Sequence, residues 1–194
     1  MAVLSMPANA LASDPPTFVD PDAPSPMYLR FEGDGTALVG FLPTPVIGGQ
    51  VAIAAGRPWL HARVGVGASA APAFGLGRGS VGSVLETADL RACGAAHRTR
   101  HRFRLCAGGQ AGVMHLRWMN FAAEGRRELP VLGAVLGGDY GIALGRLVDL
   151  HAGIDLVVPI VGAQLSARGA DSVDRMRTGS VATAFRLGIG FRLH

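Results

Sequence analysis

Large apolar residues alternate with small or charged ones along most of the chain, with a period of two residues. The pattern is clearest between Val181 and Leu193, where Val, Phe, Leu and Ile hold most of the odd positions. The even positions of the same segment are Ala, Gly and Arg. A period of two is that of a β-strand, whose successive side chains point to opposite faces. This segment is therefore predicted to be a strand with one bulky apolar face.

The same alternation recurs upstream and predicts further strands. The eight predicted ranges are 27–42, 46–56, 58–70, 80–94, 102–118, 129–145, 147–165 and 179–193. Each is long enough to cross the hydrocarbon layer of a bilayer, which takes about 9–11 residues of tilted strand. Longer links are expected at 71–79, 120–128 and 168–178, alternating with tight turns, so both termini should lie at the rim with the tight turns.

The two faces of these strands differ in side-chain size more than in polarity. One face carries Leu, Val, Ile and Phe, and the other carries Gly and Ala with isolated Arg, Asp and His. Small residues with a few opposite charges fit the narrow lumen of a small barrel, while a smooth apolar face fits lipid. We therefore predict an all-β fold, an eight-stranded antiparallel up-and-down transmembrane β-barrel. The alternative is a soluble lipocalin-like ligand-binding barrel, with the apolar faces turned inward.

The last predicted strand carries a more specific pattern. Arg186, Gly188, Phe191 and Leu193 have the spacing polar-x-Gly-x-x-aromatic-x-hydrophobic. With this motif, the chain resembles the small eight-stranded bacterial outer-membrane β-barrels of the OmpA-like and OmpX-like type. In that family the closing strand presents the motif to the barrel-assembly machinery. The resemblance therefore implies that machinery as a partner and the bacterial outer membrane as the location. The family usually ends on an aromatic residue, where this chain adds His194.

Composition agrees with a barrel and disfavours other classes. Of 194 residues, 28 are Gly, 49% are apolar, and the net charge is only +4. So many apolar residues are atypical of a disordered chain. The glycines are scattered through the apolar segments, and each costs about 1 kcal/mol inside a helix, which disfavours a helical bundle.

The N-terminal part is expected to lie outside the barrel. Residues 1–12 end in Ala-Leu-Ala, a small-x-small cleavage pattern, and are interpreted as the remnant of an export signal. Residues 13–26 contain five prolines and three aspartates and are predicted to be an extended tail. The barrel domain should cover 27–194.

Charged residues on the small-residue face are predicted to form a polar network inside the barrel, because buried charges need partners of opposite sign. The predicted members are Arg63, Asp139, Asp149, His151, Asp155, Arg186 and Arg192. An alternative is an outer-membrane lipid hydrolase in which Asp149 and His151 activate a water or a serine. No serine adjoins them in the sequence, so we expect no enzyme.

Two cysteines, Cys93 and Cys106, are separated by twelve residues. In an exported protein they are expected to form a disulfide, with free thiols as one alternative. A second alternative is a zinc site that adds His97 and His101. We place the four residues at a hairpin facing the periplasm.

Arginines outside the lumen suggest contacts with phosphate. Possible lipopolysaccharide contacts in the predicted longer links are Arg126, Arg127, Arg168, Arg175 and Arg177. The basic run 98–104 is predicted to be a solvated or headgroup-facing turn, not a nucleic-acid contact. The expected role is structural, envelope-stabilising or interaction-based, with passage of water or very small solutes as a further possibility. We expect a monomer, with outer-membrane lipid as its surroundings and no cofactor, metal or nucleic acid.

Overall fold

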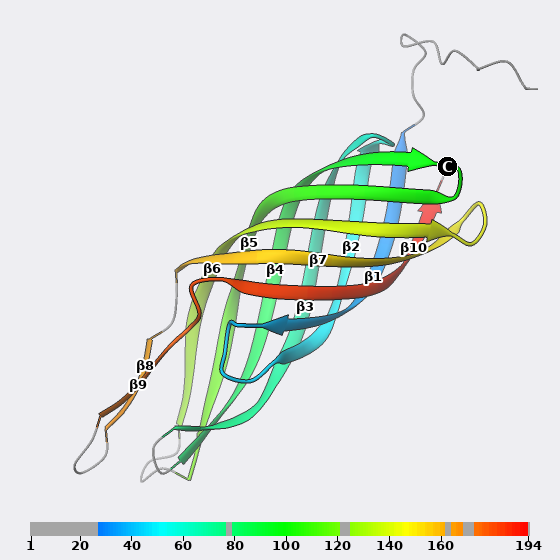
Figure 1. The fold of residues 1–194 in the computed structure, drawn as a ribbon. Coiled ribbons are helices and arrows are strands. Elements are labelled where there is room, and N and C mark those ends of the chain that lie inside the picture. The colour runs from blue at the N-terminus through cyan, green and yellow to red at the C-terminus, as the bar shows by residue number, and fades with distance from the viewer. Residues whose placement is uncertain (1–26, 77–78, 121–124, 162–163, 169–172, 194) are drawn as a thin grey trace, which may run out of the picture.

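The chain forms a closed ring of antiparallel strands in the computed structural model, which describes residues 27–76, 79–120, 125–161, 164–168 and 173–193 (Figure 1). The predicted signal remnant 1–12 and tail 13–26 lie outside the described residues, as does His194. No helix among the described residues is long and apolar enough to span a membrane.

Eight strands make up the barrel, as the alternation predicts. They are β1 (Tyr28–Val39), β2 (Val46–Arg57), β3 (Leu60–Leu76), β4 (Gly79–Arg98), β5 (His101–Met119), β6 (Gly125–Ala143), β7 (Val148–Val161) and β10 (Ala182–Leu193). Consecutive strands pair around the ring, and β1 pairs with β10 to close it, with Leu29 opposite Leu193 and Val39 opposite Thr183. The eight-stranded antiparallel barrel is thus confirmed.

Strands β3 to β6 are longer than the sequence pattern predicts. They have 17 to 20 residues, against 12 to 14 for the other barrel strands. Strand therefore extends into both predicted links, over 71–76 and 79 in the first and over 125–128 in the second, and the green strands β4 and β5 extend beyond the ends of blue β1 and red β10 (Figure 1). A paired sheet satisfies its backbone hydrogen bonds in water as well as in lipid, so pairing need not stop where the apolar pattern ends.

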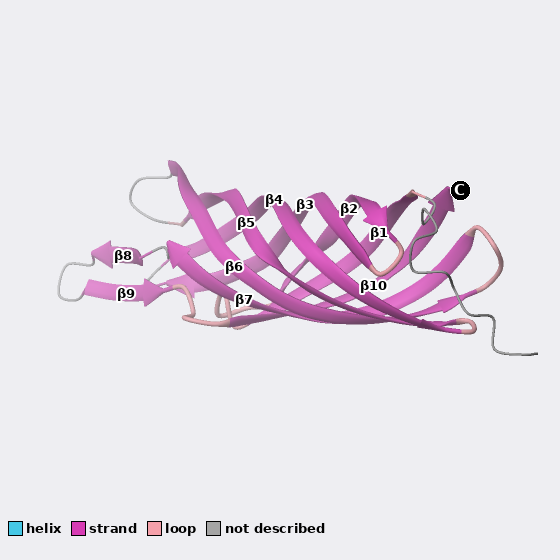
Figure 2. Cartoon of the chain, turned by 90° about the horizontal axis from the view of Figure 1, so that it is seen from above, coloured by secondary structure: helices cyan, strands magenta, loops and turns pink. Residues whose placement is uncertain are grey.

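The predicted link 168–178 also contains structure. After β7 ends at Val161, the strands β8 (Gln164–Arg168) and β9 (Val173–Arg177) form a separate antiparallel hairpin. Figure 2 shows this hairpin beyond the end of the barrel. The predicted strand 147–165 is thus too long at its C-terminal end.

The outer surface of the barrel is apolar, as predicted. Phe185, Leu187 and Ile154 are 48%, 69% and 52% exposed, whereas the neighbouring Arg186 and Asp155 are 4% and 1% exposed. An apolar exterior around a charged interior suits lipid and not water. The lipocalin-like alternative with inward apolar faces is therefore wrong.

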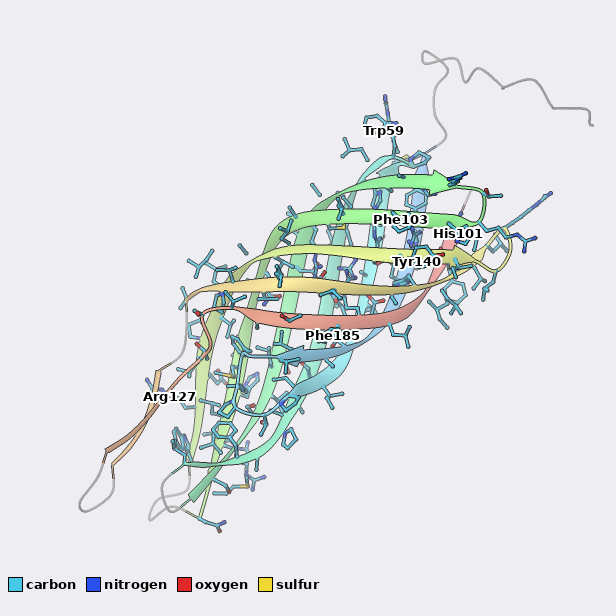
Figure 3. The ribbon with its side chains drawn as sticks, in the orientation of Figure 1. Trp59, His101, Phe103, Arg127, Tyr140 and Phe185 are labelled. Atoms are coloured by element: carbon cyan, nitrogen blue, oxygen red, sulfur yellow. A yellow bond between two sulfur atoms is a disulfide. The ribbon has the colours of Figure 1, made fainter. Side chains whose placement is uncertain are left out.

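Aromatic side chains gather on the exterior near the rim with the tight turns. The rings of Phe103 and His101 lie 5.0 Å and 5.8 Å from that of Tyr140, and the His101 Nδ1 is 2.5 Å from the Tyr140 hydroxyl. Figure 3 shows these residues and Trp59 toward this rim, and Arg127 toward the other end. Aromatic side chains with polar tips are typical of the edges of a membrane-spanning surface.

A charge placed in the middle of the lipid-facing surface should destabilise the barrel. Leu136 lies on the exterior of β6 and is 59% exposed, and Leu144 lies in a turn and is 63% exposed. We expect Leu136→Arg to lower the free energy of unfolding in lipid vesicles by about 2–4 kcal/mol, and Leu144→Arg by about 0–1 kcal/mol. Denaturant titration measures both. Equal costs would contradict the assignment of this surface to lipid.

Candidate functional site

The half of the lumen nearer to the rim with the tight turns and the chain termini, which we call the terminal rim, is filled by charged side chains. Among the described residues, six arginines and six carboxylates are buried. They are Arg30, Arg63, Arg91, Arg102, Arg104 and Arg186, and Glu32, Asp34, Asp89, Asp139, Asp149 and Asp155. We call this set the ionic plug. Equal numbers of opposite charges allow every member to be paired, which burial requires.

Arg63 on β3 uses its whole guanidinium group within the ionic plug. Its Nε is 2.8 Å from Glu32, its Nη2 is 3.1 Å from Asp34, and its Nη1 is 2.9 Å from Asp89. Arginine suits this position because its donors form a rigid planar fork that remains charged when buried.

Other pairs cross the lumen between strands that do not touch in the sheet. Arg104 on β5 donates to Glu32 on β1, which lies on the opposite side of the ring, and its Nε is 2.7 Å from Asp139. Arg91 on β4 reaches Asp155 on β7 at 2.6 Å. Ion pairs thus connect strands across the lumen, in addition to the hydrogen bonds that pair neighbouring strands.

Glycine on the inner face makes room for these charges. A Cβ atom at Gly190 would overlap the guanidinium of Arg30, and one at Gly137 would overlap the carboxylate of Asp155. The high glycine content of the small-residue face is therefore needed at these positions for close approach, since glycine has no side chain to occupy the space.

His151 is held between two partners inside the ionic plug. An Arg30 Nη2 lies 3.0 Å from its Nδ1, and Asp34 Oδ1 lies 2.5 Å from its Nε2. Arginine can only donate, so Nδ1 accepts and Nε2 carries the proton that is donated to Asp34. Both ring nitrogens are engaged, and the group is 2% exposed. The contacts of His151 include no serine or other hydroxyl nucleophile, so they give no support to the alternative of a hydrolase that uses Asp149 and His151.

One group of described residues has the composition of a metal site. Ligand atoms of Glu32, Asp34 and His151 lie within 4.8 Å of one another. Arg63 donates to both carboxylates, however, and His151 donates to Asp34. A cation would have to displace these donors, so the geometry favours the ion pairs.

The structure brings together all seven residues of the predicted lumen network. They are Arg63, Asp139, Asp149, His151, Asp155, Arg186 and Arg192. Arg192 lies at the edge, with its Nε 3.2 Å from Asp149. The predicted network omits the members that β1, β4 and β5 contribute. The prediction for the basic run 98–104 is wrong at its end, since Arg102 and Arg104 are buried in the lumen. The signal that marks the omitted residues is a charge at every second position, as in Arg102-x-Arg104.

The opposite half of the lumen is closed by apolar side chains. The cluster comprises Phe41, Leu42, Val46, Ala71, Phe74, Leu76, Val81, Leu85, Met114, Leu116, Val131, Val135, Val157 and Ala182. We call it the apolar plug. Phe41 and Leu42 come from the link between β1 and β2, which folds inward, and the Phe41 carbonyl accepts a hydrogen bond from the Gly179 amide at 3.1 Å. The predicted strand 27–42 therefore ends three residues early, at Val39.

A small cavity separates the two plugs. It has a volume of about 60 Å³ and is bordered by Leu85 and Val157 on one side and by Asp89 and Arg186 on the other. That volume has room for a few water molecules. The space is too small for an organic solute.

The predicted disulfide is present. Cys93 on β4 lies directly opposite Cys106 on β5, and their sulfurs are bonded. Both are buried on the face that carries Arg91 and Arg104, so they lie within the wall and not at the hairpin itself. The free-thiol alternative is wrong for this structure.

The zinc alternative is also wrong, because the disulfide uses both sulfurs. His97 instead places its Nε2 3.1 Å from the carbonyl oxygen of Pro58, and His101 contacts Tyr140.

The arginines predicted to contact lipopolysaccharide lie on strands and not in loops. Arg126 and Arg127 are exposed on the outer end of β6. Arg168 ends β8, and Arg175 and Arg177 belong to β9. The predicted assembly signal Arg186, Gly188, Phe191 and Leu193 lies on β10, with Phe191 and Leu193 on the exterior.

Removing both partners of a pair that spans the lumen should cost less than the two single removals added together. We expect Arg104→Met to lower the free energy of unfolding by about 3–5 kcal/mol, because Glu32 loses its closest partner. The double variant E32L/R104M should be less destabilised than the sum of its single variants, by about 1–3 kcal/mol. Denaturant titration of all four proteins in one lipid gives this coupling. Strict additivity would show that the pair is not coupled.

Reduction should add two hydrogens to the intact mass of the protein, because the only two cysteines are bonded. C93A/C106A should fold and should lose up to about 3 kcal/mol of stability, the chain-entropy value for a loop of this length. Mass spectrometry and denaturant titration check the two statements. An unchanged mass after reduction would contradict the disulfide.

Solved structures match this fold, whereas scans against protein-family models and curated proteins give no match. A major outer membrane protein from Thermus thermophilus is 16% identical with a TM-score of 0.60, over 85% of this chain and 99% of that one. Neisserial surface protein A (NspA) is 9% identical with a TM-score of 0.55, over 86% and 97%. Ail of Yersinia pestis, in complex with the heparin analogue sucrose octasulfate, is 8% identical with a TM-score of 0.52, over 86% and 97%. The chain therefore has the fold of the small eight-stranded β-barrels of the bacterial outer membrane.

Proposed function

We propose that this protein is a closed, non-enzymatic barrel of the bacterial outer membrane, where it stabilises the envelope and presents an extended outer sheet for interaction. The observation that carries this proposal is the filling of the lumen from both ends. The ionic plug occupies one half and the apolar plug occupies the other, with only about 60 Å³ between them. A lumen filled in this way supports an anchoring role more than transport.

Passage of solutes is the weaker candidate. An ion that enters from the terminal rim meets paired charges such as Arg104 and Glu32, which have no free coordination to offer. An ion at the other end meets Phe41 and Met114, which are 2% and 0% exposed. Water at the central cavity is compatible with the geometry, but continuous flow requires both plugs to open.

The surroundings favour lipid and lipopolysaccharide as partners. In outer-membrane barrels the short turns and the termini face the periplasm, which places the long ends of β3 to β6 outside the cell. Arg126, Arg127 and the arginines of β8 and β9 would then be at or above the level of lipopolysaccharide phosphates. The motif on β10 supports recognition by the barrel-assembly machinery during biogenesis. We propose that the barrel functions as a monomer.

A closed barrel should not conduct ions. We expect the wild-type protein to give no discrete current steps in a planar lipid bilayer, because two plugs in series block the lumen. F41A/L42A and E32A/R104A each open one plug and should also remain silent. The fourfold variant that combines them should conduct.

The shift in gel migration between heated and unheated protein verifies that each variant has folded before it is tested. Wild-type conductance would contradict the proposal. Conductance of either double variant would show that the other plug does not seal the lumen.

A further inference from the structure

One side of the lipid-facing surface has a shallow, open depression. A groove of about 950 Å³ runs over β1 to β5, and its outward residues are mostly small, such as Gly35, Gly49, Ala68, Ala88 and Ala111. The exteriors of β7 and β10, in contrast, project Leu, Ile and Phe, which are 43–69% exposed. The shape of the groove suits a long flexible chain, whereas the hollow of about 690 Å³ over β5, β6, β7 and β10 is lined on the outside mainly by large residues such as Phe103, Tyr140 and Phe185.

A charged groove continues from the outer end of the small-residue groove. It has a volume of about 680 Å³, it shares Glu86 with the first groove, and it is lined by Arg117, Arg126 and His115. On β3, Ala68 of the first groove is followed by the outward Ala70 of the second. Together the two grooves form one continuous surface. The small-residue groove is its apolar part, and the charged groove around Arg117 and Arg126 is its polar part, which we call the head.

The head contains two facing positive charges. Arg117 on β5 and Arg126 on β6 are direct cross-strand neighbours, and both are exposed on the exterior. Like charges in facing positions destabilise a sheet. Within the described part of the chain, neither guanidinium has a carboxylate partner. An anion that bridges the two would relieve their repulsion, and phosphate matches the forked donors of arginine.

The two acidic residues of the head, Glu86 and Glu128, both lie close to His115. His115 places its two ring nitrogens 3.7 Å from Glu86 and 3.3 Å from Glu128. Their remaining carboxylate oxygens are acceptors for hydroxyl or amide N–H groups. A headgroup that combines phosphate with such donors therefore fits better than phosphate alone.

We propose that this surface is a binding site for one phosphorylated glycolipid of the outer leaflet. Its phosphate bridges Arg117 and Arg126, its sugar hydroxyl or amide groups donate to Glu86 and Glu128, and an acyl chain lies in the groove over Ala88 and Ala111. The site extends the proposed contact with lipopolysaccharide and rests on the proposed outer-membrane location. It does not depend on whether the lumen conducts.

Native mass spectrometry of the folded protein in detergent, titrated with diphosphorylated lipid A, tests the site. The wild-type protein should retain one lipid. R117Q/R126Q should bind at least about tenfold more weakly, since the phosphate loses both charged, forked donors. R117K/R126K should be intermediate, because lysine keeps the charge but loses the fork. R98Q/R100Q, which removes two exposed arginines near the opposite rim, should bind like the wild type.

The groove has its own matched pair of variants. A88L/A111L fills it and should weaken lipid binding severalfold, whereas A134L/A152L adds the same bulk to the exterior of β6 and β7 and should not. Inorganic phosphate in excess should fail to displace the lipid, since it lacks the acyl chain. Wild-type affinity in R117Q/R126Q or in A88L/A111L would overturn the proposal, as would displacement by phosphate. If the lipid-binding test fails while the wild-type barrel conducts no current, the glycolipid site is wrong and the proposed closed-barrel function still stands.

Discussion

The requirement that every charge in the lumen has a partner governs this structure. An isolated ion in a medium of low dielectric constant is so costly that an unpaired arginine or carboxylate would not be tolerated. Among the described residues, six arginines and six carboxylates meet this requirement, some by contacts between neighbouring strands and some, such as Arg104 with Glu32, by contacts across the ring. Replacing such pairs with apolar residues is often neutral for stability, so the network is better understood as specifying one arrangement of the wall than as adding to its net stability.

The same requirement explains the unusual composition of the chain. Arginine can satisfy three acceptors at once, as Arg63 does, whereas lysine offers a single ammonium group on a flexible stem. Glycine at positions such as Gly137 and Gly190 leaves space for these groups. The use of arginine for the buried cations and of glycine at positions such as Gly137 and Gly190 thus has a common cause in the narrow charged lumen.

Much of the barrel follows from period-two alternation, and the exceptions have physical reasons. On β7 and β10, bulky outward residues such as Ile154 and Leu187 make the period obvious and identify Asp155 and Arg186 as inward. On β1 the outward residues include Gly33 and Gly35, so bulk gives a weak signal there, and the inward charges are marked only by their spacing at every second position. The inward fold of Phe41 depends on contacts with distant strands, which no local pattern encodes. The extension of β3 to β6 depends on backbone pairing, which is nearly independent of side chains.

The contact between Glu32 and Arg104 joins the first barrel strand to one on the far side of the ring. Strand β1 supplies Glu32 and Asp34, a third of the buried carboxylates, and it neighbours β10, the last strand in the sequence. In an open sheet in which β1 has not yet met β10, Arg104 would keep Asp139 on the neighbouring β6 but would lie far from Glu32. The ion pairs that cross the lumen are therefore completed only when the seam closes. These pairs favour the closed form of the sheet over the open one, in addition to the backbone hydrogen bonds between β1 and β10.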